Sequence, residues 1–97
     1  MPTEIETTIA RLLKETLGAH SVYETSVLGG VFDEDWSSWY ATYLVEHGLP
    51  DLLPNGDKLD ANRLGAMLTQ LDVDYRRTQP ESDWPAYYAR RLSAAVE

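Results

Sequence analysis

The chain of 97 residues contains no cysteine, so it can form neither disulfide bonds nor thiolate metal sites. It has no apolar run that approaches the roughly 20 residues a helix needs to cross a bilayer. Basic groups are also scarce, with eight Lys and Arg against sixteen Asp and Glu and a net charge of −8. This charge disfavours binding to nucleic acid or to an anionic membrane, because both require clustered Lys and Arg.

The charged groups are unevenly distributed between the two halves of the chain. Residues 1–48 carry eight acidic and two basic groups, whereas residues 49–97 carry eight acidic and six basic groups. The basic groups of the second half could therefore pair with the acidic first half, within one chain or across a dimer.

Length and composition favour a single domain over residues 1–97. Independent domains usually have about 50 to 200 residues, and the 43% of hydrophobic residues and ten aromatic residues are enough for a compact core. A chain this short buries a modest share of its surface, so dimerisation would add stability. The acidic N-terminal sequence lacks the basic and apolar regions of a signal peptide, so we expect a cytoplasmic protein.

An aromatic stretch from Asp33 to Gly48 holds two of the three tryptophans and two of the six tyrosines. Its skeleton, Asp-Trp-x-x-aromatic-Tyr-Ala-x-x-Leu, begins at Asp35 and recurs at Asp83, forty-eight residues later. We therefore interpret the chain as two helical hairpins, in halves 1–48 and 49–97, that arose by duplication.

The first half is predicted to contain two helices. Thr3 and Glu6 have the spacing of a capping box, and the first helix is expected to run from Thr3 to about Thr25. Gly18 lies off the apolar stripe, so it costs only about 1 kcal/mol of helix propensity. That stripe consists of Ile5, Ile9, Leu12, Thr16, Ala19, His20, Tyr23 and Val27.

The second helix is expected to follow the acidic run 33–35, whose carboxylates would cap its N-terminus. It should end at Gly48, which suits a left-handed backbone, shortly before Pro50. In the connector 49–59, Leu52 and Leu53 are expected to reach the core, and Asn55-Gly56 is typical of a tight turn.

The second half is predicted to contain a third and a fourth helix, which makes the fold class all-α. Asp60 suits the N-cap of the third helix, with Leu59 and Leu64 as a hydrophobic staple. The break falls at residues 78–82, after two arginines at 76–77 that offset the negative helix end. The fourth helix is expected from 82–83 to about residue 95, with Pro85 in its first turn.

The second helix has more apolar surface than one partner helix can cover. A helical wheel at 100° per residue gives an arc of about 100° that contains the aromatic residues Trp36, Trp39, Tyr40 and Tyr43 together with His47. Ala41, Leu44 and Val45 extend this apolar surface past half the circumference. In the second copy Arg91 replaces an aromatic residue, and it could stack on a ring for about 0.5–2 kcal/mol. The residues that we single out as ligand- or partner-binding candidates are Trp36, Trp39, Tyr40, Tyr43, His47, Trp84 and Arg91.

This aromatic surface has three explanations. It can be ordinary core, which is the usual reason for aromatic residues at helical spacing. It can be a protein interface, homodimeric or with another protein, since Trp, Tyr and Arg are enriched at binding hot spots. It can also line a pocket for a small apolar ligand between the second and fourth helices, with tyrosine hydroxyls and His47 as polar contacts.

The sequence contains no signal for catalysis. His20 and Glu24 have i, i+4 spacing, but a structural histidine bonded to a neighbouring side chain is the preferred interpretation over a metal site. The acidic run 33–35 is explained by capping, and nothing in its pattern indicates burial. Since no nucleophile motif or phosphate-binding loop is present, we expect no enzyme activity, cofactor or metal.

The stretch from Asp33 to Gly48, with Ala19-His20 and Tyr23-Glu24 upstream, resembles a group of small bacterial proteins that share a Trp-x-x-Trp-Tyr-Ala core. The resemblance covers about a third of the chain. It implies a bacterial, all-helical, stand-alone protein. The group has no established activity, so no functional residue is transferred.

The first functional hypothesis is therefore a non-catalytic interaction protein that homodimerises through the aromatic face of the second helix. The alternative is a small-molecule binder with its site between the second and fourth helices. A third hypothesis is that the acidic surface imitates nucleic acid and occupies a basic protein, which requires acidic side chains along one exposed face.

Overall fold

The computed structural model describes residues 3–31, 33–53, 59–81 and 83–95, and this part of the chain contains no strand. Its elements are α1 (Glu4–Ser26), α2 (Trp36–Glu46), the short 3-10 helix η1 (Leu49–Leu52), α3 (Ala61–Thr78) and α4 (Trp84–Ala95). The prediction of an all-α chain of four helices is therefore confirmed.

The N-terminus of α1 is held by the predicted capping box. The Thr3 hydroxyl accepts the backbone N–H of Glu6 at 3.1 Å, and Glu6 Oε2 accepts the backbone N–H of Thr3 at 3.4 Å. The helix continues through Gly18 and ends at Ser26, close to the expected end. Capping bonds within four residues therefore determine where α1 begins.

Local signals also set most of the other helix ends. Gly48 has a φ of +88° and follows the end of α2, as predicted. Asp60 caps α3 by accepting the backbone N–H of Arg63 at 2.8 Å. α3 continues to Thr78, and the next residue, Gln79, ends it with a φ of +47°. The predicted turn at Asn55-Gly56 lies outside the described residues.

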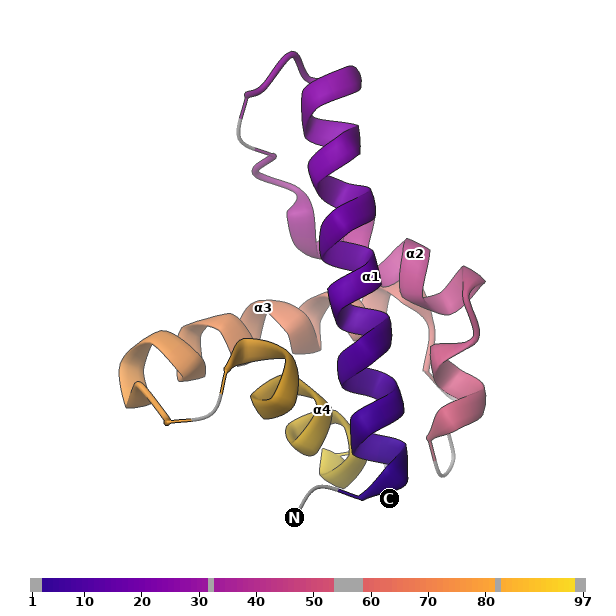
Figure 1. Ribbon diagram of the computed structural model, residues 1–97, viewed down its shortest axis with the longest axis vertical. Helices are drawn as coiled ribbons and strands as arrows, with labels where there is room; N and C mark the ends of the chain where they lie inside the picture. The colour runs from indigo at the N-terminus through magenta and orange to yellow at the C-terminus, as the bar shows by residue number, and fades with distance from the viewer. Residues whose placement is uncertain (1–2, 32, 54–58, 82, 96–97) are drawn as a thin grey trace.

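The helices pack in alternating pairs. α1 lies against α4 and α2, while α3 lies against α2 and α4. The approach of α3 to α2 uses Gly65, where an added Cβ would lie 3.6 Å from the Ser37 carbonyl oxygen and 3.7 Å from the Ala41 Cβ. Figure 1 shows that α1 runs along the long axis and that its C-terminal end projects beyond the other helices, with the chain from residue 27 returning beside it.

The two aromatic helices contribute corresponding positions to a core that α1 and α3 also build. All three buried residues of α2 have a buried counterpart in α4 at the same place in the repeated skeleton. These pairs are Tyr40 with Tyr88, Ala41 with Ala89, and Leu44 with Leu92. Leu49 and Leu53 are buried as well, and Leu52 packs against the core from η1.

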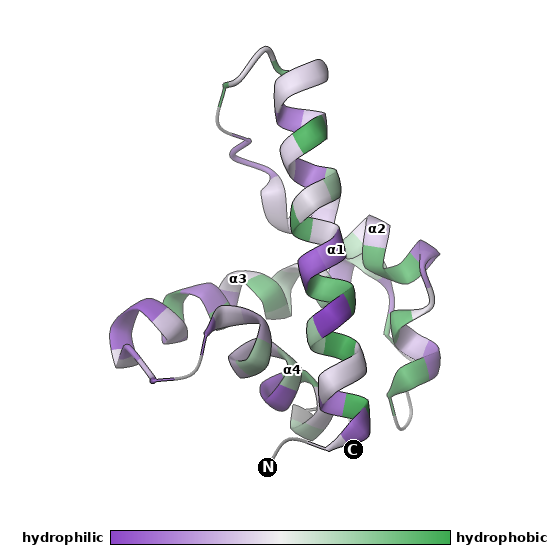
Figure 2. Ribbon diagram, in the orientation of Figure 1, coloured by the Kyte–Doolittle hydropathy of each residue, from purple (hydrophilic) through white to green (hydrophobic). Residues whose placement is uncertain are grey.

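The projecting end of α1 and the turn after it remain apolar on the outside. Val22, Val27 and Val31 are each about two-thirds exposed, at 64%, 66% and 67%, and Figure 2 shows hydrophobic segments in this region. Over the residues that the structure describes, no helix is both long and apolar enough to pass through a membrane.

Candidate functional site

A buried histidine fastens the turn before α2 to α1. His20 is only 5% exposed, and its Nε2–H donates a 2.9 Å hydrogen bond to Oδ2 of Asp33. Glu24 places Oε1 3.5 Å from Nδ1 of His20, and its Oε2 accepts the backbone N–H of Asp33 at 3.2 Å. The prediction of a structural histidine bonded to neighbouring side chains is confirmed.

The acidic run 33–35 has a different role from the capping role that we expected. Asp35, the N-cap of α2, makes no capping hydrogen bond through its side chain. Asp33 accepts the backbone N–H of Asp35 through Oδ1 at 3.0 Å, and its side chain is 11% exposed. The expected capping by the Asp35 side chain is therefore wrong, although Asp35 is exposed as expected. The expected exposure of Asp33 is wrong because the bond to His20 holds its carboxylate inward.

Four aromatic side chains form a continuous series, which we name the ring row: Tyr23, Trp39, Tyr43 and His47. The centroids of Tyr23 and Trp39 are 5.4 Å apart, and Trp39 stacks on Tyr43 at 5.4 Å with an interplanar angle of 15°. Tyr43 stacks on His47 at 3.8 Å. The first three rings are half-buried and His47 is exposed, so the row offers preformed aromatic surface to the outside.

The His47 ring is fixed by the end of α2. Its Nδ1–H donates to the backbone carbonyl of Tyr43 at 2.8 Å, where the helix leaves carbonyl groups without an internal donor. His47 therefore extends the ring row and helps to close the helix.

A groove of about 400 Å³ runs beside the ring row. Three aromatic rings form its apolar wall and three carboxylates lie around it, and none of its lining residues is basic. We name it the acidic-aromatic groove, and its lining is Tyr23, Asp33, Asp35, Ser38, Trp39, Thr42, Tyr43 and Glu46.

A second groove, of about 440 Å³, lies where the two aromatic helices face α1 and α3. Trp36 meets Tyr40 edge-to-face at 5.6 Å, and Trp84 meets Tyr88 edge-to-face at 5.3 Å. We name it the central groove, and its lining is Leu17, His20, Glu24, Trp36, Tyr40, Asp72, Tyr75, Arg76, Trp84 and Tyr88. The expected cleft between α2 and α4 is thus also formed by α1 and α3.

Burial keeps two tyrosines of the central groove protonated. Desolvation, with a smaller contribution from the charge of Glu24, raises the pKa of Tyr40 to about 12. Burial also raises the pKa of Tyr88, and the nearby Asp72 carboxylate acts in the same direction. Both hydroxyls therefore stay neutral to a higher pH than the tyrosines of an unfolded chain, which titrate near pH 10.

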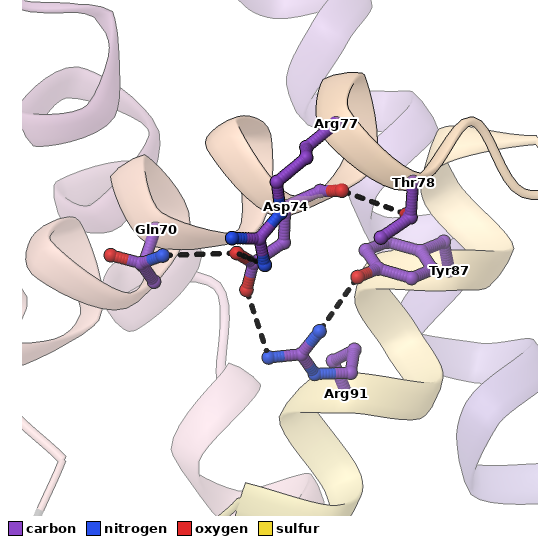
Figure 3. A network of polar contacts seen from close by, with 6 residues as sticks. All are labelled: Gln70, Asp74, Arg77, Thr78, Tyr87 and Arg91. Atoms are coloured by element: carbon purple, nitrogen blue, oxygen red, sulfur yellow. Dashed lines mark hydrogen bonds and ion pairs between the residues drawn. The ribbon is translucent and has the colours of Figure 1, made fainter.

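Arg91 belongs to a polar network between α3 and α4 rather than to either groove (Figure 3). Its Nη2 lies 3.1 Å from Asp74 Oδ2, and its Nη1 donates to the Tyr87 hydroxyl at 2.6 Å. The guanidinium carbon lies 5.6 Å from the centroid of the Tyr87 ring, which confirms the predicted stacking on an aromatic ring.

Asp74 is the centre of this network, and the sequence patterns did not point to it. It is buried although it carries a charge, and it also accepts from Gln70 Nε2 at 3.0 Å and from Arg77 Nη2 at 3.2 Å. The hydrogen bond from Gln70, followed by Arg91 and Arg77, lowers the pKa of Asp74 despite the opposing effect of burial. Asp74 lies three positions after the buried Leu71 and therefore on the same face of α3. This spacing was the signal in the sequence that Asp74 could be buried.

The structure divides the seven candidate residues among different environments. Trp36, Tyr40 and Trp84 line the central groove, while Trp39 and Tyr43 line the acidic-aromatic groove. Of the three residues that line the central groove, Tyr40 is buried, at 7% exposure, whereas Trp36 and Trp84 are half-buried. The aromatic arc of α2 therefore faces two grooves instead of one.

Within the described ranges, no group of three or more His, Asp or Glu side chains is arranged to hold a metal ion. The chain matches no protein-family model, no curated protein and no solved structure. Its function is therefore inferred from the two grooves and the surfaces around them.

Proposed function

We propose that the protein is a non-catalytic interaction module that docks a partner protein on the ring row. The observation that carries this proposal is the stacked series Tyr23–Trp39–Tyr43–His47, which stays open to the outside while α2 is already packed into the core. Preformed, half-buried aromatic surface is typical of interface hot spots, since it binds with little loss of conformational freedom.

The packing of α2 supports a docking role for this face. Its core contacts are made by Tyr40, Ala41 and Leu44. The fold therefore does not need Tyr43 or His47 for the interior, because His47 is exposed and Tyr43 is only half-buried. Exposed valines on the projecting end of α1 provide additional apolar area at the same end of the molecule as the turn before α2.

The distribution of ion pairs also supports a partner. Every ion pair among the described residues joins groups of the same half, such as Arg91 with Asp74 or His20 with Asp33. The expected pairing of second-half basic groups with first-half acids within one chain is not seen in this part of the structure. Among the described residues, the exposed carboxylates of Asp35 and Glu46 in the first half take part in none of these pairs, so they are accessible to another molecule.

A non-catalytic role is supported by the way the reactive groups are used. His20 is enclosed between Asp33 and Glu24, where its hydrogen bonds hold the turn before α2. The most buried carboxylate, Asp74, is occupied by Gln70, Arg77 and Arg91. Both ionisable clusters therefore have a structural explanation.

Self-association is the first form of docking to test, since a two-fold dimer needs only one self-complementary surface. A variant with Trp36→Phe and Trp84→Phe leaves Trp39 as the single tryptophan, so its fluorescence reports on the ring row. Analytical ultracentrifugation over a range of concentrations should show association, with a blue shift of Trp39 emission as the row is covered.

The test variant is Tyr43→Ser in α2, which shortens the ring row. The matched control is Val73→Ser, which removes an exposed apolar side chain from α3, away from the ring row. We expect the first to weaken association about tenfold or more and the second to leave it unchanged. A strict monomer whose Trp39 emission is already that of a buried indole would contradict docking on this face.

The central groove favours a second candidate function, binding of a small molecule. The Trp36–Tyr40 and Trp84–Tyr88 pairs line one space of about 440 Å³, within the size range of small-ligand sites. Thermal-shift screening against aromatic acids and nucleosides tests it, with Tyr88→Phe as the variant that removes one groove hydroxyl. The absence of any stabilising compound in a broad library would argue against this function.

A further inference from the structure

We propose that the acidic-aromatic groove binds a basic segment of a partner protein, with an arginine or lysine side chain stacked on the ring row. This inference rests on the proposed docking function and adds the chemistry of the partner. It follows from three observations: the sign of the charges around the groove, the geometry of its rings, and a cation–ring contact that the protein already contains.

The charges around the groove are all negative. Asp33, Asp35 and Glu46 line it, and no Lys or Arg does. Asp35 and Glu46 are exposed, whereas Asp33 is occupied by His20. Since the chain has a net charge of −8, the potential at the groove attracts cations and repels acidic partners.

The rings of the groove suit a flat cation. Trp39 and Tyr43 are nearly parallel with centroids 5.4 Å apart, the separation of offset stacking, which leaves part of each ring face uncovered, and Tyr23 lies 5.4 Å from Trp39. A guanidinium or ammonium group within about 6 Å of such a ring is attracted by its π electrons, most strongly by tryptophan. Carboxylates beside the rings would accept the N–H groups of the same cation.

The second half of the chain contains the same combination within itself. In the repeated skeleton, Tyr87 stands where Trp39 does, and Arg91 stands where Tyr43 does. The Arg91 guanidinium lies over the Tyr87 ring and pairs with the Asp74 carboxylate. In the first half Tyr43 takes the place of the arginine and stacks on Trp39, while the carboxylates beside the rings have no basic side chain among the groove residues. A basic side chain from a partner would supply the cation that this half lacks.

The length of the groove favours a segment over a single small amine. Asp35 and Glu46 lie at the two ends of α2, eleven residues or about 16 Å apart along the helix axis. An extended chain covers this distance in about five residues. A segment with two basic side chains four or five positions apart would reach both carboxylates, with one of them over the ring row.

The same charges make a second copy of this chain the weaker of the two occupants, so self-association through the ring row should be weaker than binding of a basic segment. Two copies would bring two surfaces of net negative charge together, whereas a basic partner gains from the attraction. The distinction is measurable, because docking of a basic segment must weaken with salt, which screens exposed charges beyond about 8 Å at physiological ionic strength.

The test uses the full chain and isothermal titration with the synthetic peptide Arg-Ala-Ala-Ala-Arg, blocked at both ends. The control peptide carries citrulline in place of both arginines, which keeps the shape and removes the charge. The groove variant is Asp35→Asn with Glu46→Gln, and the matched control variant is Glu15→Gln with Glu81→Gln, which changes the charge equally at exposed positions outside the groove.

We expect the wild type to bind the arginine peptide. The affinity should fall at least about tenfold when the groove variant or Tyr43→Ser replaces the wild type, when the citrulline peptide replaces the arginine peptide, or when the salt is raised to about 0.5 M. The control variant should bind like the wild type. Thermal unfolding of each variant checks that it is folded.

Lack of arginine-peptide binding, equal binding of the citrulline peptide, or full binding to the groove variant would overturn the inference. If free arginine amide binds as tightly as the peptide, the ligand of the groove is a small cation and not a segment of a partner protein. If self-association requires Tyr43 but is unaffected by salt and by the groove substitutions, the docking function stands and the proposal of a basic partner is wrong. If Tyr43→Ser affects neither association nor peptide binding, the docking function fails as well.

Discussion

His20 Nε2 and Asp33 Oδ2 are 2.9 Å apart although thirteen residues separate them in the sequence. This contact closes the turn between α1 and α2, and it sets the position at which α2 begins. Trp39 lies 4.9 Å from the His20 ring, so the same histidine also supports the first part of the ring row. The ring row thus depends on a buried polar contact that belongs to the fold.

Replacement of Asp33 by alanine should therefore loosen the start of α2. We expect a loss of about 1–3 kcal/mol in the free energy of unfolding, because His20 is left buried without its hydrogen-bond acceptor. Urea denaturation measures the loss, and faster amide exchange at residues 33–36 locates it. Glu34→Ala is the control, since Glu34 is exposed. Equal effects of the two substitutions would contradict this role of Asp33.

Two glycines should respond to alanine in opposite ways. Gly18 has ordinary helical backbone and open space around it, so Gly18→Ala should stabilise the protein by about 0.5–1 kcal/mol. Gly48 also has open space, but its φ of +88° disfavours a Cβ, so Gly48→Ala should destabilise by about 1 kcal/mol. Thermal and urea unfolding of both variants give the signs, and two changes of the same sign would contradict the explanation.

The helix ends were predictable because their causes are local. Thr3 and Glu6 are three residues apart, Asp60 caps a residue three positions away, and the Gly48 conformation depends on the helix directly before it. Such interactions can be recognised from spacing alone, because they form within one helical turn. Most of the helix ends followed from them, but the expected side-chain cap of α2 did not form, because Asp35 makes no capping hydrogen bond through its side chain.

The candidate site was less predictable because its contacts depend on how helices cross. The wheel placed Trp36, Trp39, Tyr40 and Tyr43 on one arc, but packing against α1 and α3 divides this arc between two grooves. The burial of Asp33 likewise depends on a histidine thirteen residues away. The duplication of the hairpins remains a prediction, although three buried positions of α2 and α4 correspond.

High pH should destabilise the protein through its buried tyrosines. Tyrosine in an unfolded chain titrates near pH 10, whereas burial and Glu24 raise the pKa of Tyr40 to about 12 in the folded state. The stabilisation is fully present below the unfolded pKa, and it is lost as the pH rises between these two values, because only the unfolded chain then releases the proton. Tyr40→Phe should show a smaller loss in this range.

The measurement is a set of urea midpoints across the alkaline range, combined with ultraviolet absorbance of the phenolate. The buried Tyr40 and Tyr88 of the central groove should ionise only as the protein unfolds or near their raised pKa. Ionisation of all six tyrosines in a single step near pH 10 without unfolding would contradict the burial of Tyr40 and Tyr88.

Acid should have the converse effect through Asp74. Gln70, Arg91 and Arg77 lower the pKa of Asp74 in the folded state, so the carboxylate stabilises the fold above the unfolded pKa of about 3.9, and this contribution is lost as the pH falls through the folded value. Asp74→Asn lacks the contribution at every pH. The gap in urea midpoint between wild type and variant should therefore be larger at about pH 7 than at about pH 3.

Asp72→Asn on the same helix is the matched control. Asp72 pairs with Arg76, whose side chain is 77% exposed, and exposed ion pairs contribute little because water and salt screen them. Its midpoint should stay close to that of the wild type at both pH values. If Asp74→Asn and Asp72→Asn behave alike, the network of Figure 3 does not join α3 to α4 in the way proposed. Arg91→Lys then separates charge from geometry, since lysine retains the charge but cannot reach Asp74 and the Tyr87 hydroxyl with one planar group.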